Sequence, residues 1–275
     1  MKRIFVCLVL FFISGGLALS FATASINAAA PTILPTVSPT TSSTISPTVS
    51  PTTFPTMFWA DEFDASALKE KWSWVREDSA YWSLTQRPGF LVINTQVGSV
   101  VGTGNQNKNM LLQDMPVGDF EIQTHLVFTP TQNYHFAGLL LYEDDDNFIR
   151  FGRGYCLLSG VTTCQGGAIY FNQEISGTVN IIMTPTVTAG DIYLRVAKQE
   201  TAYTGYFSDD GANWILLGTY HGSTPTKIGL MAESSTGGAS TTPAAFDYFW
   251  VGDNRYRTFL PLIFTVDVPI IYWHL

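Results

Sequence analysis

Charged side chains are scarce in this sequence: Asp, Glu, Lys and Arg make up only 13% of its 275 residues. Acidic residues outnumber basic ones by 22 to 14, and Lys and Arg form no cluster along the chain. Proteins that bind nucleic acid or anionic membranes carry a basic patch that neutralises phosphates. The composition therefore argues against nucleic acid and against an anionic membrane surface as partners.

Cysteine is also scarce, with three residues in the whole chain. Cys7 lies in an apolar N-terminal run that we interpret below as a signal peptide, so we expect it to be lost. Cys156 and Cys164 remain, and an even pair in an exported protein predicts a disulfide across the short loop between them. Two unpaired buried thiols are the alternative. Zinc is not expected, because it needs four ligands and no suitable His or Cys lies nearby.

Helical periodicity is almost absent after residue 56. About fourteen short runs with period-two alternation follow instead, separated by Gly, Asp, Asn and Pro. This pattern predicts an all-β fold, a two-sheet antiparallel sandwich or jelly roll over residues 57–254. A domain of that length can bury a substantial core.

The N-terminus has the features of an export signal. Residues 1–3 carry positive charge, residues 4–22 are almost wholly apolar, and small residues continue to Ala30. We predict a signal peptide over residues 1–30, cleaved after Ala24 or near residues 28–30, and hence a secreted or cell-surface protein. An uncleaved N-terminal anchor is the alternative, since the apolar run is nearly long enough to span a bilayer.

Two further segments lie outside the expected sandwich. Residues 31–56 repeat Pro-Thr and Ser-Pro without charge, which predicts a disordered linker with a stiff, extended backbone. Residues 255–275 are apolar but contain Asp267 and two prolines, so we expect no membrane span there. Whether this tail adds an edge strand, packs on the sandwich or serves in docking stays open.

The central stretch, HFAGLLLYEDDDNFIRFGRG at residues 135–154, predicts a β-hairpin. Apolar arms at residues 137–142 and 148–151 flank a turn of acidic residues and Asn147. The first arm is apolar at nearly every position, as expected for a strand deep inside a sheet. The acidic turn lacks the Gly and the distant Glu of a helix–loop–helix calcium site, so we interpret it as a solvated turn.

Several segments together resemble one family: WSWVRE, RPGFL, NMLLQ, FAGLLLY with DDNFIRFGR, LRV, YFSDDGANW, KIGLMA and FDYFWV. In order and spacing they are similar to the concanavalin A-like lectin/glucanase superfamily, and within it to the β-sandwich at the C-terminus of bacterial β-xylosidases. The resemblance covers about residues 58–251. It implies two curved antiparallel sheets with a concave face that in many members binds carbohydrate.

Catalytic relatives resembling laminarinases carry Glu-x-Asp-x-x-Glu on one strand, where alternation places the carboxylates on one face. This chain has no such motif. The nearest candidate, residues 143–146, lies in a turn, and Phe148 stands where the second Glu should be. We therefore expect a non-catalytic carbohydrate-binding module for plant-type or other neutral polysaccharide. A divergent glycoside hydrolase or its accessory domain is the first alternative, and an adhesion or structural domain without a sugar site is the second.

The resemblance also implies a structural calcium ion. Glucanase-like relatives hold calcium with backbone carbonyls and an Asp of the final strand, a position that Asp247 matches, while Asp61 and Glu62 lie near the first strand. We take Glu62 and Asp247 as candidate ligands. The alternative is that they cap strand ends or bond backbone amides.

Sugar contacts would need aromatic planes and a few side chains that bond hydroxyl groups. Strict alternation in WSWVRE predicts that Trp74 and Arg76 share a face. The candidate sugar-binding residues are Trp74, Arg76, Tyr81, Trp82, Tyr142 and Arg150. The alternative is that the tryptophans belong to the core and that each arginine pairs with Glu77 or another acidic neighbour.

Overall fold

The computed structural model describes residues 57–157, 165–185, 190–234, 241–253 and 271–274. These residues all belong to one compact unit, Pro51–Leu275. They form two antiparallel β-sheets of eight strands each, and the only helical elements among them are two 3₁₀ turns, η1 (Ser79–Tyr81) and η2 (Gly102–Gly104). No helix in this part of the chain has the length and hydropathy of a membrane span. The predicted all-β sandwich is confirmed.

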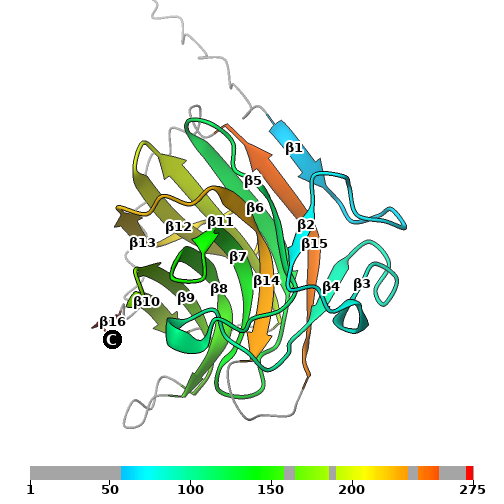
Figure 1. Ribbon diagram of the computed structural model, residues 1–275, viewed down its shortest axis with the longest axis horizontal. Helices are drawn as coiled ribbons and strands as arrows, with labels where there is room; N and C mark the ends of the chain where they lie inside the picture. The colour runs from blue at the N-terminus through cyan, green and yellow to red at the C-terminus, as the bar shows by residue number, and fades with distance from the viewer. Residues whose placement is uncertain (1–56, 158–164, 186–189, 235–240, 254–270, 275) are drawn as a thin grey trace, which may run out of the picture. The chain divides into compact units, whose positions relative to one another are not determined.

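Figure 1 shows the two sheets stacked face to face, with sheet B toward the viewer. Sheet A has the strand order β13 (Ile215–His221), β12 (Ala202–Ser208), β11 (Asp191–Gln199), β6 (Phe120–Val127), β15 (Pro243–Gly252), β4 (Leu91–Asn94) and β3 (Trp82–Ser83), and β1 (Met57–Asp61) also pairs with β15. Sheet B has the order β16 (Ile271–His274), β10 (Thr178–Pro185), β9 (Gln165–Ile175), β8 (Asn147–Leu157), β7 (His135–Asp144), β14 (Lys227–Ser234), β5 (Met110–Asp114) and β2 (Ser73–Val75).

The main core lies between the sheets, because alternate residues of each strand point inward. In β6, Phe120, Ile122 and Leu126 are completely buried, and β11 contributes its own inward residues beside them. Each such side chain stabilises the fold by about 1.5–3 kcal/mol relative to exposure. The inward-pointing residues of the period-two pattern thus form the interface between the two sheets.

The central hairpin is confirmed as β7 and β8, which pair antiparallel around the acidic turn. The Asp144 carboxylate accepts hydrogen bonds from the Asp146 amide at 2.9 Å and from the Asn147 side chain at 2.8 Å. Leu139 faces the main core, whereas Leu140 belongs to a second apolar cluster on the other side of sheet B. Sheet B therefore carries apolar residues on both faces, and its outer face needs a cover.

The expected alternation of WSWVRE is wrong after Val75. Strand β2 ends there, and Arg76 adopts a left-handed backbone with φ of 52°. That conformation breaks the period of two, so Trp74 and Arg76 do not share a strand face.

Several predictions fall outside the described residues: the signal peptide at 1–30, the linker at 31–56 and Cys164. The backbone of Cys156 lies in β8, and the disulfide stays a prediction. In the expected tail, β16 pairs antiparallel with β10 at the edge of sheet B.

Candidate functional site

The outer face of sheet B, where three of the predicted sugar-binding residues lie, is covered by residues 97–109, which we call the covering segment. This segment joins β4 to β5 and crosses in front of sheet B in Figure 1. Its Val100 is completely buried in the second apolar cluster. The other buried members of that cluster are Met110, Leu112, Phe136, Leu140, Phe148 and Met231. The covering segment therefore fills the centre of the outer face of sheet B.

Arg150 lies beneath the covering segment and is only 9% exposed. Its guanidinium forms a buried ion pair with Glu233 of β14, and it lies 4.2 Å from the ring centre of Phe136. When the Asn172 amide is oriented with its oxygen toward Arg150, that oxygen accepts two further hydrogen bonds from the guanidinium, at 3.0 and 3.1 Å. The donors of Arg150 are therefore used inside the protein, and we do not retain it as a sugar contact.

Glu233 and Glu174 hold the covering segment in place. Glu233 accepts from the Val100 amide at 3.0 Å and from the Ser99 hydroxyl at 3.2 Å. Glu174 of β9 accepts from the Gly102 amide at 2.9 Å. Burial raises the pKa of Glu174, although the hydrogen bond from Gly102 opposes the shift. Two carboxyl groups thus lie under one segment, in an environment that disfavours charge on Glu174.

Arg76 and Tyr142 meet at the rim of the same face through a common partner, Asp145. Arg76 donates to both Asp145 oxygens at 2.8 Å, and Tyr142 donates to one of them at 2.8 Å. Arg76 also donates to the Asn107 carbonyl at 2.6 Å. The hydrogen bonds to Asp145 raise the pKa of Arg76, and burial together with Asp145 raises the pKa of Tyr142. This cluster ties the end of β2, the hairpin turn and the covering segment together.

The two predicted tryptophans lie elsewhere. Trp74 is on β2, at one edge of sheet B, and Trp82 is on β3, at one edge of sheet A. Their ring centres are 4.9 Å apart, and both pack against the main core. Tyr81 precedes Trp82 at the end of η1. The six candidates therefore do not line one groove: the tryptophan pair closes an edge between the sheets, while Arg76, Tyr142 and Arg150 belong to the covered face.

Each arginine has an acidic partner, as the alternative interpretation expected, but neither partner is Glu77. Glu77 accepts instead from the Trp82 ring nitrogen at 3.1 Å. Asp145 is the partner of Arg76, and Glu233 is the partner of Arg150.

Residues 60–252, most of the chain, match the family described as "Beta xylosidase C-terminal Concanavalin A-like domain". The chain belongs to this family. The resemblance stated from the sequence is therefore confirmed, and the two stacked sheets are the family's β-sandwich.

Relatives of this β-xylosidase C-terminal domain come from larger proteins. The chain is 27% identical over 202 residues to the non-reducing end α-L-arabinofuranosidase BoGH43B of Bacteroides ovatus, a match covering 69% of this chain and 36% of that protein. Among solved structures it is similar to GH43 BlXynB from Bacillus licheniformis (22% identity, TM-score 0.61, 70% of this chain and 39% of that chain). It is also similar to xylan β-1,4-xylosidase from Bacillus halodurans C-125 (23% identity, TM-score 0.60, 70% and 39%). The structural matches show the fold, and the chain spans less than two fifths of each of these proteins.

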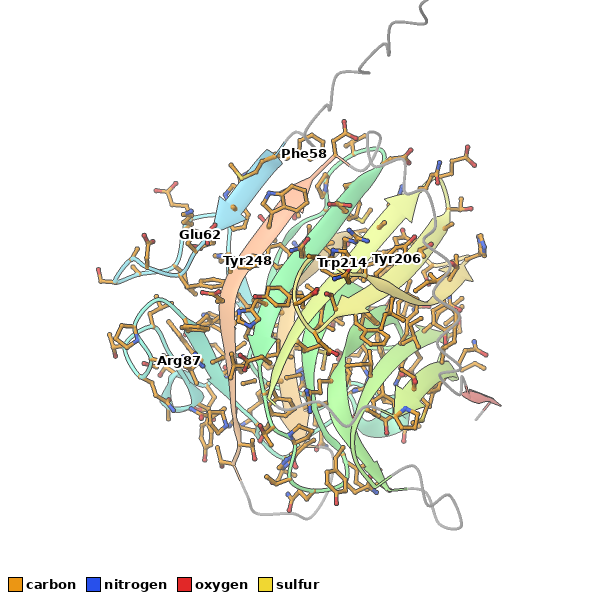
Figure 2. All side chains as sticks on the ribbon, turned by 180° about the vertical axis from the view of Figure 1, so that it is seen from behind. Phe58, Glu62, Arg87, Tyr206, Trp214 and Tyr248 are labelled. Atoms are coloured by element: carbon orange, nitrogen blue, oxygen red, sulfur yellow. The ribbon has the colours of Figure 1, made fainter. Side chains whose placement is uncertain are left out.

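The two candidate calcium ligands, Glu62 after β1 and Asp247 in β15, lie near each other. Asp247 lies close enough to Glu62 to contribute to the raised pKa of that carboxyl group, of which burial is the largest cause. Asp247 is also 3.1 Å from the His125 ring nitrogen Nδ1, and Figure 2 shows Glu62 at the end of β1. The described part of the chain contains no cluster of three or more His, Cys, Asp or Glu side chains suited to a metal. Calcium would need backbone carbonyls as further ligands, and calcium binding at this position stays a prediction.

Sequence reasoning missed Glu174 and Glu233. Arg150, inside an apolar strand, indicated that an acidic partner must exist. The identity of that partner depends on the strand order β8–β7–β14, which places residues 83 positions apart on one face. Local patterns do not contain that order.

Proposed function

We propose that this chain is a non-catalytic module that binds neutral, pentose-containing polysaccharide outside the cell. Its family is the C-terminal domain of β-xylosidases, and its relatives include an α-L-arabinofuranosidase and a xylan β-1,4-xylosidase. The scarcity of charge and the absence of a basic cluster in the sequence suit an uncharged ligand. The predicted signal peptide supports the extracellular location.

The non-catalytic part of this proposal rests on the burial of Glu174 and Glu233 beneath the covering segment. A glycosidase needs two carboxyl groups that reach the scissile bond from either side. Here Glu174 is completely buried and Glu233 is 1% exposed. Both Glu233 oxygens accept from the covering segment or from the Arg150 guanidinium, and one Glu174 oxygen accepts from the Gly102 amide. A substrate would have to displace the covering segment to reach either group.

Affinity electrophoresis tests this proposal. The protein should be retarded in gels that contain arabinoxylan or arabinan, relative to gels without polysaccharide and to a non-binding marker protein. Incubation with the same polysaccharides should release no reducing sugar. If the protein is not retarded and releases no reducing sugar, an adhesion or structural domain is favoured instead.

A glycoside hydrolase is the second candidate function, because one observation favours it. Burial raises the pKa of Glu174, and Glu233 lies on the same face of sheet B, so two carboxyl groups lie in one region as they do in glycosidases. Nitrophenyl arabinofuranoside and nitrophenyl xyloside are suitable probes. We expect no hydrolysis by the wild type; hydrolysis that Glu174→Gln abolishes would instead establish the enzyme.

A further inference from the structure

A cavity of about 410 Å³ opens between the sheets, at a place that the sequence did not indicate. It is bordered by β1 and β15 of sheet A and by β5 and β14 of sheet B. Two buried core residues form part of its wall: Val251, which pairs with Trp59, and Ile228, which pairs with Gln113. Its volume is within the range of pockets that hold small ligands, about 300–1,000 Å³. We call it the end cavity.

Gln113 gives the end cavity a polar group without a partner. Alternation along β5 places Met110 and Leu112 on the covered face and Leu111 in the main core, so Gln113 points toward the space between the sheets. Its side chain lines the cavity and is only 4% exposed. Within the described residues its buried amide nitrogen makes no hydrogen bond. Because buried amides are nearly always paired, an acceptor that reached this side chain from the cavity would complete a bond that the described residues leave unmade.

Trp59 gives the cavity a fixed aromatic wall. Its ring centre is 5.2 Å from that of Trp72 and 6.3 Å from that of Phe249, both in edge-to-face arrangements. Phe58, labelled on β1 in Figure 2, also lines the cavity. Its side chain is 46% exposed. An aromatic ring held in this way offers area for stacking at little cost in conformational entropy.

Two charged side chains of opposite sign, Lys71 and Asp114, line the cavity, and both are exposed. Asp114 also forms an ion pair with Lys227 at 2.9 Å. A charged ligand would gain from one of these side chains and lose from the other. A neutral ligand with hydroxyl groups can accept from Lys71 and Gln113 and donate to Asp114.

We propose that the end cavity binds the end of a neutral saccharide chain, with an apolar sugar face against the aromatic wall and a ring or hydroxyl oxygen accepting from Gln113. This inference rests on the proposed function and gives it a location. The site uses the opening between the sheets, so it is independent of the covered face of sheet B.

Isothermal titration calorimetry with xylotriose and arabinotriose tests the inference on the full chain. Gln113→Leu removes the donor at nearly constant volume, and we expect the affinity to fall by about tenfold or more. Val117→Trp places a large ring at the mouth of the cavity, where Val117 is fully exposed at 101%, so the fold should be unaffected and binding should be blocked. Leu216→Trp on β13, which is 54% exposed and does not line the cavity, is the matched control and should bind like the wild type.

The outcomes separate the site from the function. Weaker binding by both cavity variants, with unchanged melting of Val117→Trp, supports the end cavity. Wild-type binding that persists in both variants overturns the end cavity but leaves the proposed function intact. Wild-type protein that binds neither trisaccharide nor the polysaccharides overturns both.

Discussion

Arg150 is the residue on which the covered face of sheet B depends most. Its guanidinium is buried against Phe136 and satisfied by Glu233 and Asn172, so a full positive charge is held inside the protein. Such a pair adds little net stability compared with apolar residues of the same size, but removal of one partner leaves an uncompensated charge.

At this scale we predict that Glu233→Gln lowers the free energy of unfolding by about 3–5 kcal/mol, because Arg150 then remains charged and buried. Urea denaturation measures the change. The exposed pair between Lys227 and Asp114, at 2.9 Å, supplies the control. Lys227→Ala should cost no more than about 1 kcal/mol, since exposed ion pairs contribute little. Similar losses in the two variants would contradict the buried-pair interpretation.

Single residues also mark the limit of the sequence analysis. The need for a partner was visible for Arg76 and Arg150, because arginine is rarely buried alone. The partner itself was not, because Asp145 and Glu233 are brought close by pairing between strands far apart in the sequence. Trp74 and Trp82 were ambiguous for a similar reason: an edge strand in a sandwich presents aromatic residues both to the core and to its rim.

Among the elements, the covering segment controls access to the outer face of sheet B. Its composition, rich in Gly and Asn, is typical of a loop. Its position on sheet B depends on Val100 and on hydrogen bonds to carboxylates more than 70 residues away in the chain. Loop composition contains no information on such distant contacts, whereas the central hairpin was predictable because its turn and its arms are adjacent in the sequence.

We predict that Gly98→Ala loosens the covering segment. Gly98 has φ of +134°, and an added Cβ would lie 2.5 Å from the Gln106 carbonyl oxygen. The expected loss is about 2–3 kcal/mol in the free energy of unfolding, with faster proteolysis within residues 97–109.

Gly89→Ala is the matched control for this change. Gly89 also has a positive φ, +78°, but an added Cβ there would meet nothing within 4 Å. Its loss should be about 1 kcal/mol, from backbone strain alone. Equal losses for both glycines would show that the covering segment is not tightly seated.

For the molecule as a whole, the sandwich was predictable because many weak signals agree. Period-two runs, turn residues and the order of family-like segments all indicated two stacked sheets, and each sheet has eight strands. The pairing order within the sheets was not predictable in the same way. The prediction that the candidate sugar-binding residues line one groove depended on this pairing order. The structure instead places those residues at separate positions.

Calcium, if bound between the first and last strands of sheet A, would stabilise the whole sandwich. We predict that a chelator lowers the melting midpoint, because a ligand at a hundred times its dissociation constant contributes about 2.7 kcal/mol. Differential scanning calorimetry with and without EDTA measures the effect, and Asp247→Asn should abolish the difference. A melting midpoint that is the same with calcium and with EDTA would show that calcium does not stabilise this fold.

The tryptophan pair at the sandwich edge has a spectroscopic consequence. Trp74 belongs to one sheet and Trp82 to the other, and their indole rings are 4.9 Å apart. The strong indole transitions couple as an exciton at that separation, which gives a paired positive and negative band in the far-ultraviolet circular dichroism. The contribution of Trp74 and Trp82 to this couplet exists only while the two sheets remain closed at that edge, so its decay during unfolding reports separation of the layers.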